Sequence, residues 1–155
     1  MAGEQRHPDG GRSLLDNVRL LGRLSSAELA PWFSRASIYA LPARYEPFGL
    51  SVLEAAQAGC ALVLGDIDSL REVWGDAAIY VAPDDAHALE DALQRLIAQP
   101  LLLQCQGRFA AARAQRYGAR AMVDGYRRLY AELVQRRQSV SLPRVPASAM
   151  PGMRA

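Results

Sequence analysis

The sequence has 155 residues, of which 50% are hydrophobic and 22% are charged. This is enough for one globular domain with a core and is ordinary for an α/β protein. The longest apolar runs are too short for a membrane span, and the polar first residues do not form a signal peptide, so we expect a cytoplasmic protein.

The basic residues are unevenly placed along the chain. All 18 are arginine, and ten of them fall in residues 108–155, against two acidic residues there. Such a basic end can lie on anionic lipid or RNA. Solvated faces of two terminal helices explain it more simply. We therefore predict no nucleic-acid partner and leave membrane contact open.

Cysteine and histidine provide no evidence for a metal site. Cys60 and Cys105 form neither a metal-binding spacing nor a disulfide framework, and His7 and His87 stand apart from them. We therefore interpret both cysteines as ordinary thiols and predict no zinc site.

Both ends of the chain differ in composition from the middle. Residues 1–13 are rich in glycine and charge without periodicity, and residues 138–155 hold three prolines and little apolar surface. We predict that these two segments are disordered and that residues 14–137 form the folded domain.

Within residues 14–137, short β-type runs alternate with helical patterns. This alternation predicts parallel strands joined by right-handed crossovers, a partial Rossmann-like sheet of about four strands with flanking helices. Ligands bind at the carboxyl ends of the strands in such sheets. The predicted strands cover residues 18–22, 37–42, 61–65 and 78–82.

Helix signals lie between and after these runs. Ser25 and Glu28 form a capping box at the start of the first helix, and Gly59 is a natural stop for the second. The later helices are predicted to begin at Asp84 or Asp85 and to cover residues 101–116 and 119–137.

The loop after the predicted strand 37–42 contains a carboxylate at the expected ligand edge. Pro47 holds Glu46 in an extended conformation, and Gly49 lets the backbone approach a ligand closely. The first amides of the next helix, near Gly49, Leu50 and Ser51, lack intrahelical acceptors and suit a phosphate.

A second carboxylate, Glu54, lies about five residues into that helix, or roughly 7.5 Å along its axis. A nucleotide diphosphate at the helix start can place its ribose there. The helical wheel turns Glu54 away from the apolar stripe, so for Glu54 taken alone ordinary solvation is a better explanation than ribose binding. Glu46 and Glu54 can together hold the sugar and ribose ends of a nucleotide-sugar, but their spacing leaves the choice open. The apolar stripe consists of Val52, Ala55, Ala56 and Gly59.

Residues 18–97 carry an ordered series of motifs: an apolar strand ending in glycine, a strand ending in proline, "EPFGLSVLE", an aspartate after the next strand, and the segments "REVWGDAAIYV" and "DD". This series resembles the later part of the C-terminal, donor-binding domain of family 4 retaining glycosyltransferases, which have the GT-B fold. The likeness extends over about residues 14–135.

The resemblance implies roles for individual residues. It makes Glu46 the catalytic contact to the donor sugar, gives Glu54 the ribose hydroxyls, and makes Arg23 a stacking partner of the base, although a solvated loop residue explains Arg23 as well. It implies no metal or other cofactor. The dipeptide Asp66-x-Asp68 matches the metal motif of the other main glycosyltransferase fold, which we keep as the less favoured alternative. The backbone amides implied for the diphosphate belong to Phe48, Gly49 and Leu50.

The implied function is hexosyl transfer from a nucleotide diphosphate sugar to an unknown acceptor, with retention of configuration. The family's acceptor domain, two earlier strands and a diphosphate-binding lysine have no match here, so we expect a truncated donor-binding half that is weak or inactive alone. The alternative is a nucleotide-sugar binding or interaction module that complements a separate N-terminal domain or forms a homo-oligomer. The third hypothesis is that the chain is a structural or degraded remnant of a glycosyltransferase that binds no ligand.

Overall fold

The structure is a computed structural model that describes residues 18–139, with side chains up to residue 137. The described chain falls into two compact units, of which the first ends at Tyr117 and the second begins at Gly118. The first predicted disordered segment, residues 1–13, lies outside the described part, and so do residues 140–155 of the second segment. Residues 138 and 139 end the last helix.

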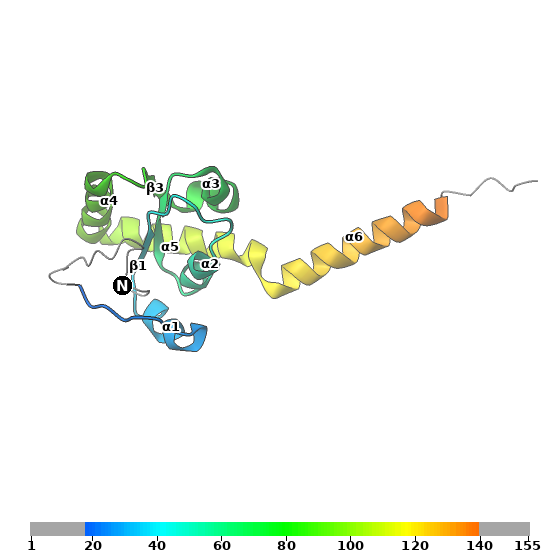
Figure 1. The fold of residues 1–155 in the computed structure, drawn as a ribbon, viewed down its shortest axis with the longest axis horizontal. Helices are drawn as coiled ribbons and strands as arrows, with labels where there is room; N and C mark the ends of the chain where they lie inside the picture. The colour runs from blue at the N-terminus through cyan, green and yellow to red at the C-terminus, as the bar shows by residue number, and fades with distance from the viewer. Residues whose placement is uncertain (1–17, 140–155) are drawn as a thin grey trace, which may run out of the picture. The chain divides into compact units, whose positions relative to one another are not determined.

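The first unit is built on a parallel sheet of three strands in the order β1 (Ile38–Leu41), β2 (Ala61–Gly65) and β3 (Ile79–Val81) (Figure 1). Ile38 pairs with Ala61, and Val63 pairs with Ile79. Every residue of the central strand β2 is buried. Its uninterrupted apolar run is typical of a parallel strand covered on both faces, and the predicted parallel α/β class is confirmed.

The expected strand over residues 18–22 is wrong, so the sheet described here has three strands rather than about four. Gly22 makes only an isolated β-bridge, and Val18 and Leu20 are exposed. An apolar run becomes a strand only where a neighbouring strand accepts and donates its backbone hydrogen bonds.

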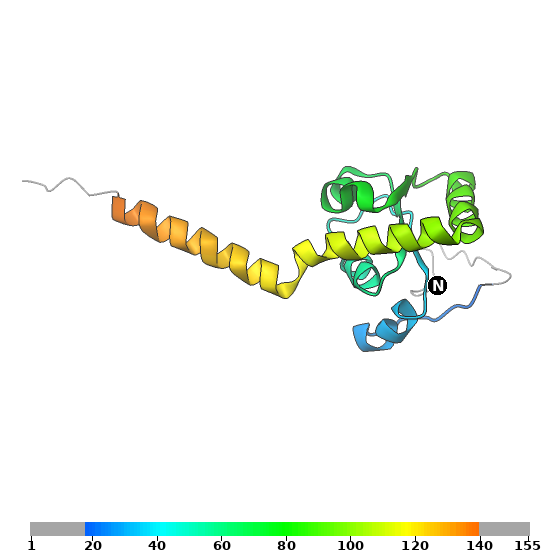
Figure 2. The same ribbon diagram turned by 180° about the vertical axis from the view of Figure 1, so that it is seen from behind.

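Helices surround the sheet in the first unit (Figure 2). Two predicted caps are present: the Glu28 carboxylate accepts the Ser25 N–H at 2.9 Å, and the Asp85 carboxylate accepts the Ala88 N–H at 2.9 Å. One helix, α3, was missing from the sequence-based prediction. The helical elements are α1 (Ser26–Phe33), α2 (Leu50–Gln57), α3 (Asp68–Trp74), the 3₁₀ turn η1 (Gly75–Ala77), α4 (Ala86–Ala98), α5 (Pro100–Ala114) and the 3₁₀ turn η2 (Gln115–Tyr117).

The two faces of the sheet bury separate cores. On one face, Leu62 and Leu64 pack with buried side chains of α2, α3 and α5, the largest of which is Trp74. On the other face, Val63 packs with Ala92 and Leu96 of α4. These two layers hold the strands in place and leave their carboxyl ends open to the loops that follow.

Helix α5 packs closely against the end of α2 and the start of β2. A Cβ added at Gly107 would lie 2.3 Å from the carbonyl oxygen of Gly59, so only glycine permits this approach. Gly59 itself follows α2 with a φ of 89°, as the predicted stop requires.

The second unit is the helix α6 (Ala119–Ser139). Its apolar side chains, among them Met122, Tyr126, Leu129 and Leu133, are exposed and repeat at helical spacing. No helix in residues 18–139 is both long and apolar enough to cross a membrane.

Candidate functional site

The loops that follow the three strands meet at the carboxyl edge of the sheet. Arg44, after β1, forms an ion pair with Asp84, after β3. The backbone N–H of Asp66, after β2, donates to the carbonyl of Val81 at 2.8 Å. The edge at which ligands were expected is therefore an assembly of all three loops.

The loop after β1 passes directly over the end of β2. A Cβ added at Gly65 would lie 2.3 Å from the carbonyl oxygen and 2.9 Å from the nitrogen of Ala43. No side chain fits between two backbones this close, so Gly65 sets the path of the loop that contains Glu46.

Glu46 is half-buried and is held by the start of α2. Its Oε1 accepts the N–H of Gly49 at 2.8 Å and, more weakly, that of Phe48 at 3.4 Å. The hydroxyl of Ser69, in the first turn of α3, donates to the carbonyl oxygen of Glu46 at 2.7 Å. Both the carboxylate and the backbone of Glu46 are thus fixed by their neighbours.

The backbone turns sharply into α2 at Gly49, whose φ of 79° is left-handed. A Cβ there would lie 2.7 Å from Cγ2 of Val52. Both the left-handed φ and this lack of space therefore require glycine. Because the amides of Phe48 and Gly49 bind Glu46, the amides that lack an intrahelical acceptor begin at Leu50 and Ser51. The Leu50 side chain beside them is 69% exposed.

Glu54 is half-buried on α2 and borders its buried face more closely than the helical wheel indicates, because Leu53 is buried as well as Val52. Packing against the sheet therefore covers part of Glu54 and leaves part of it exposed.

Tyr39 of β1 is bound to the start of α2. Its hydroxyl shares a hydrogen bond of 2.8 Å with the Ser51 hydroxyl at the start of α2. Burial raises the pKa of Tyr39, and the negative charges of Glu46 and Glu54 raise it further, while the bond to Ser51 acts in the opposite direction. The sequence analysis missed Tyr39, although strand alternation places it on the face that packs against α2.

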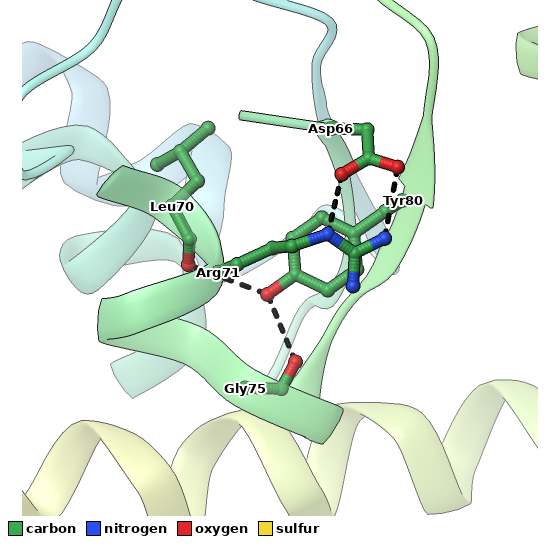
Figure 3. Close-up of polar contacts among 5 residues, drawn as sticks. All are labelled: Asp66, Leu70, Arg71, Gly75 and Tyr80. Atoms are coloured by element: carbon green, nitrogen blue, oxygen red, sulfur yellow. Dashed lines mark hydrogen bonds and ion pairs between the residues drawn. The ribbon is translucent and has the colours of Figure 1, made fainter. Parts of the chain in front are cut away.

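Asp66, which follows β2, forms an ion pair with Arg71 (Figure 3). Nε and Nη2 of Arg71 both donate to the Asp66 carboxylate, and the Nη2–Oδ2 distance is 2.8 Å. The Arg71 guanidinium lies 4.4 Å from the ring centroid of Tyr80, whose hydroxyl donates to the carbonyl of Gly75 at 2.9 Å. The bond from Arg71 lowers the pKa of Asp66 below its ordinary value.

The ion pair between Asp66 and Arg71 bears on the alternative that Asp66-x-Asp68 is a metal-binding motif. Both oxygens of Asp66 accept from Arg71. In the described part of the chain, no three His, Cys, Asp or Glu residues are grouped so as to hold a metal ion. Asp68 begins α3 instead.

The remaining predicted residues lie away from these contacts. Arg23 is exposed in the bend that follows Gly22, before α1. Cys60 is buried, its thiol donates to the carbonyl of Ala36 at 3.3 Å, and burial raises its pKa. Cys105 is exposed, and both cysteines are free thiols.

A parallel α/β layer with a helix start and acidic loops at the carboxyl edge of its strands defines a Rossmann-like, ligand-binding class of domain. The family described as "Glycosyl transferases group 1" matches residues 2–99. The chain belongs to this family of glycosyltransferases, and its fold is of the GT-B type.

Individual relatives agree with this assignment. The chain is 37% identical over 102 residues to the glycogen synthase of Mycobacterium tuberculosis, a match that covers 64% of this chain and 25% of that protein. It is 30% identical over 130 residues to the phosphatidyl-myo-inositol mannosyltransferase of Mycobacterium leprae, covering 82% and 34% respectively. The solved structure of sucrose-phosphate synthase from Thermosynechococcus elongatus superimposes with a TM-score of 0.69 at 29% identity, covering 77% of this chain and 31% of that one. The chain thus spans a quarter to a third of the length of these relatives.

Proposed function

We propose that this chain is the donor-binding part of a family 4 retaining glycosyltransferase that transfers a hexose from a nucleotide diphosphate sugar. The observation that supports this proposal is the Glu46 carboxylate held against the Gly49 N–H at the start of α2, with half-buried Glu54 on the same helix. Two carboxylates beside a helix start suit a ligand with a hydroxylated group on either side of a diphosphate.

In the proposed complex, the diphosphate lies at the start of α2, where Leu50 and Ser51 offer amides and the helix dipole favours negative charge. Phe48 and Gly49 serve the same loop indirectly, because their amides position the Glu46 carboxylate. The second carboxylate oxygen of Glu46 then faces the donor sugar.

Glu54 binds the ribose hydroxyls in this proposal, since an ionised carboxylate accepts two hydrogen bonds in a fixed fork. Arg23 stacks on the base. When the glycosidic bond breaks, the amides and the helix dipole stabilise the charge that develops on the leaving diphosphate. The chain spans only a fraction of its relatives and contains no lysine, so the proposal assigns the acceptor site and further cationic groups to residues outside this sequence.

Calorimetric titration of the chain with UDP, GDP and ADP, and with their hexose conjugates, tests the proposal. We expect saturable binding of one nucleotide series and a loss of about tenfold or more in affinity in Glu54→Ala, because a hydrogen bond to a charged group is removed. Glu90→Ala removes an exposed carboxylate from α4 and is the matched control.

Two results would overturn the proposal. One is equal affinity in Glu54→Ala and Glu90→Ala. The other is a flat titration from a chain that unfolds cooperatively, which favours a remnant without a ligand. If donor binding is found, the anomeric configuration of the product, read by NMR once the acceptor domain is supplied, tests retention.

A second candidate function is an interaction module, and the exposed apolar row of α6 favours it. We propose that this row docks on a separately encoded N-terminal glycosyltransferase domain. The replacement Leu129→Glu should abolish co-purification with such a domain, whereas Arg128→Glu, on a neighbouring exposed position, should not. Association of two copies of this chain instead, seen by light scattering, would contradict the proposed partner.

A further inference from the structure

A second concave site lies in the first unit, between η1 and α5. It is a cavity of about 430 Å³, a size that admits a small organic ligand. None of its lining residues belongs to the loop that contains Glu46, so its ligand is not the proposed donor. The lining residues used below are Trp74, Asp76, Gln106, Phe109, Arg113 and Arg116.

Two of the residues that line this cavity each contain a buried polar atom without a hydrogen-bond partner. In the described part of the chain, the buried side-chain nitrogen and oxygen atoms without a hydrogen bond are Nε1 of Trp74 and Oε1 of Gln106. Trp74 is fully buried, and both residues line the cavity. The indole N–H can only donate, and the amide oxygen can only accept. Buried polar groups are rarely left unpaired, so both atoms point to a missing partner.

Two arginines line the cavity, Arg113 on α5 and Arg116 on η2. Arg113 is fixed in place, because its Nε donates to the carbonyl of Val73 at 2.7 Å and its Nη2 donates to the carbonyl of Glu72 at 3.1 Å. Its Nη1 is not used in either bond. Arg116 follows three residues later, in the 3₁₀ turn η2, and is exposed. Asp76 lies across the cavity in η1, so the lining has a net positive charge.

The wall also contains an aromatic surface. Phe109 is 62% exposed, which is unusual for a phenylalanine in a helix that packs on a core. An apolar ligand alone would leave Trp74 and Gln106 unpaired, and a simple anion would leave Phe109 uncovered. The lining therefore favours a ligand with hydroxyl groups, an apolar face and a negative charge.

We propose that this cavity binds a sugar phosphate or a closely similar hydroxylated anion. A hydroxyl group accepts from Nε1 of Trp74 and donates to Oε1 of Gln106, the phosphate pairs with Arg116 and Nη1 of Arg113, and the C–H face of the sugar covers Phe109. Both orphan atoms are buried, so the proposed binding requires the partly exposed Gln106 side chain to turn and admit the hydroxyl.

The indole N–H of Trp74 reports directly on this site. A ¹⁵N-labelled chain gives two indole cross-peaks, because it has two tryptophans, and Trp32→Phe assigns them. We expect the Trp74 peak to shift saturably on titration with glucose 6-phosphate, and to shift far less with glucose or inorganic phosphate alone. An unmoved peak at millimolar glucose 6-phosphate would overturn the proposal.

Substitutions separate this site from general attraction to a basic helix. Arg116→Gln should weaken glucose 6-phosphate binding about tenfold, because a charge-assisted contact to the phosphate is lost. Arg108→Gln removes an exposed arginine of α5 that does not line the cavity and should leave binding unchanged. Equal weakening in both variants would contradict the proposal. Glu54→Ala, which impairs the proposed donor site, should also leave this binding intact.

Discussion

The loops after β1 and β2 lie at the same edge of the sheet, and each contains a carboxylate, yet they use it differently. Glu46 is half-buried and accepts backbone N–H groups at the start of α2. Asp66 is exposed, and a neighbouring arginine neutralises it. The first carboxylate orders a backbone that can meet a ligand, whereas the second closes a contact within its own loop.

The difference shows that an acidic residue at the ligand edge does not by itself identify a site. What distinguishes Glu46 is its surroundings: Gly65 beneath the loop, Gly49 at the turn, and the Ser69 hydroxyl that holds its backbone, while the Tyr39–Ser51 contact ties β1 to the start of α2. Substitutions at these positions and at Asp66 test whether the two loops really differ, beginning with the largest expected effect.

Gly65→Ala should have the largest effect on stability. Its Cβ would collide with the backbone of Ala43, which cannot yield as a flexible side chain can. We expect the free energy of unfolding to fall by about 3 kcal/mol, measured by urea denaturation. Gly125→Ala, where a Cβ meets nothing within 4 Å, is the control and should cause no loss. Equal stability of the two variants would mean that the loop after β1 does not depend on Gly65.

Glu46→Ala should destabilise the chain by about 1 kcal/mol, because the amides of Gly49 and Phe48 lose their acceptor. Urea denaturation should show a clearly smaller loss for Asp66→Ala, since exposed ion pairs contribute little. Equal losses would remove the contrast between the loops.

Tyr39→Phe should cost about 1 kcal/mol, because the Ser51 hydroxyl loses its partner in a half-buried place. It should also change the dependence of stability on pH. The pKa of Tyr39 is raised in the folded chain, so its contribution is fully present below its unfolded pKa of about 10 and is lost as the pH rises through the folded value. The pKa of Tyr80 is also raised in the folded chain, and Tyr80 remains in the Tyr39→Phe variant. The variant should therefore lose less stability at alkaline pH than the unchanged chain, but it should still lose some. An unchanged alkaline profile would contradict the role given to Tyr39.

Asp66→Asn should have the smallest effect. The pKa of Asp66 is lowered in the folded chain, so any contribution is present above its unfolded pKa and is lost as the pH falls through the folded value. Because the pair with Arg71 is exposed, we expect no measurable shift of the urea midpoint at neutral pH. A large shift there would show that this pair, and not Glu46, organises the edge.

The parallel sheet and most of the helices could be predicted from local patterns. The apolar runs that became β1, β2 and β3, the caps at Glu28 and Asp85, and the stop at Gly59 each depend on residues that are close in sequence. The approximate location of the candidate site followed from the rule that ligands bind at strand ends, together with the ordered motif series.

Tertiary structure decided what depends on neighbours far along the chain. The run at residues 18–22 has a strand-like apolar pattern interrupted only by Arg19, but it makes only one isolated bridge because strand pairing requires a second strand beside it. Tyr39 meets Ser51 only because β1 packs against α2, and Trp74 lines a cavity with Gln106 only because α5 packs beside η1. The sequence by itself determined the glycosyltransferase family and the α/β class, and it predicted Glu46 and Glu54 as site residues. Packing between distant segments decided which atoms surround those glutamates and which polar groups remain unpaired, because burial and hydrogen bonding are settled only when the elements pack together.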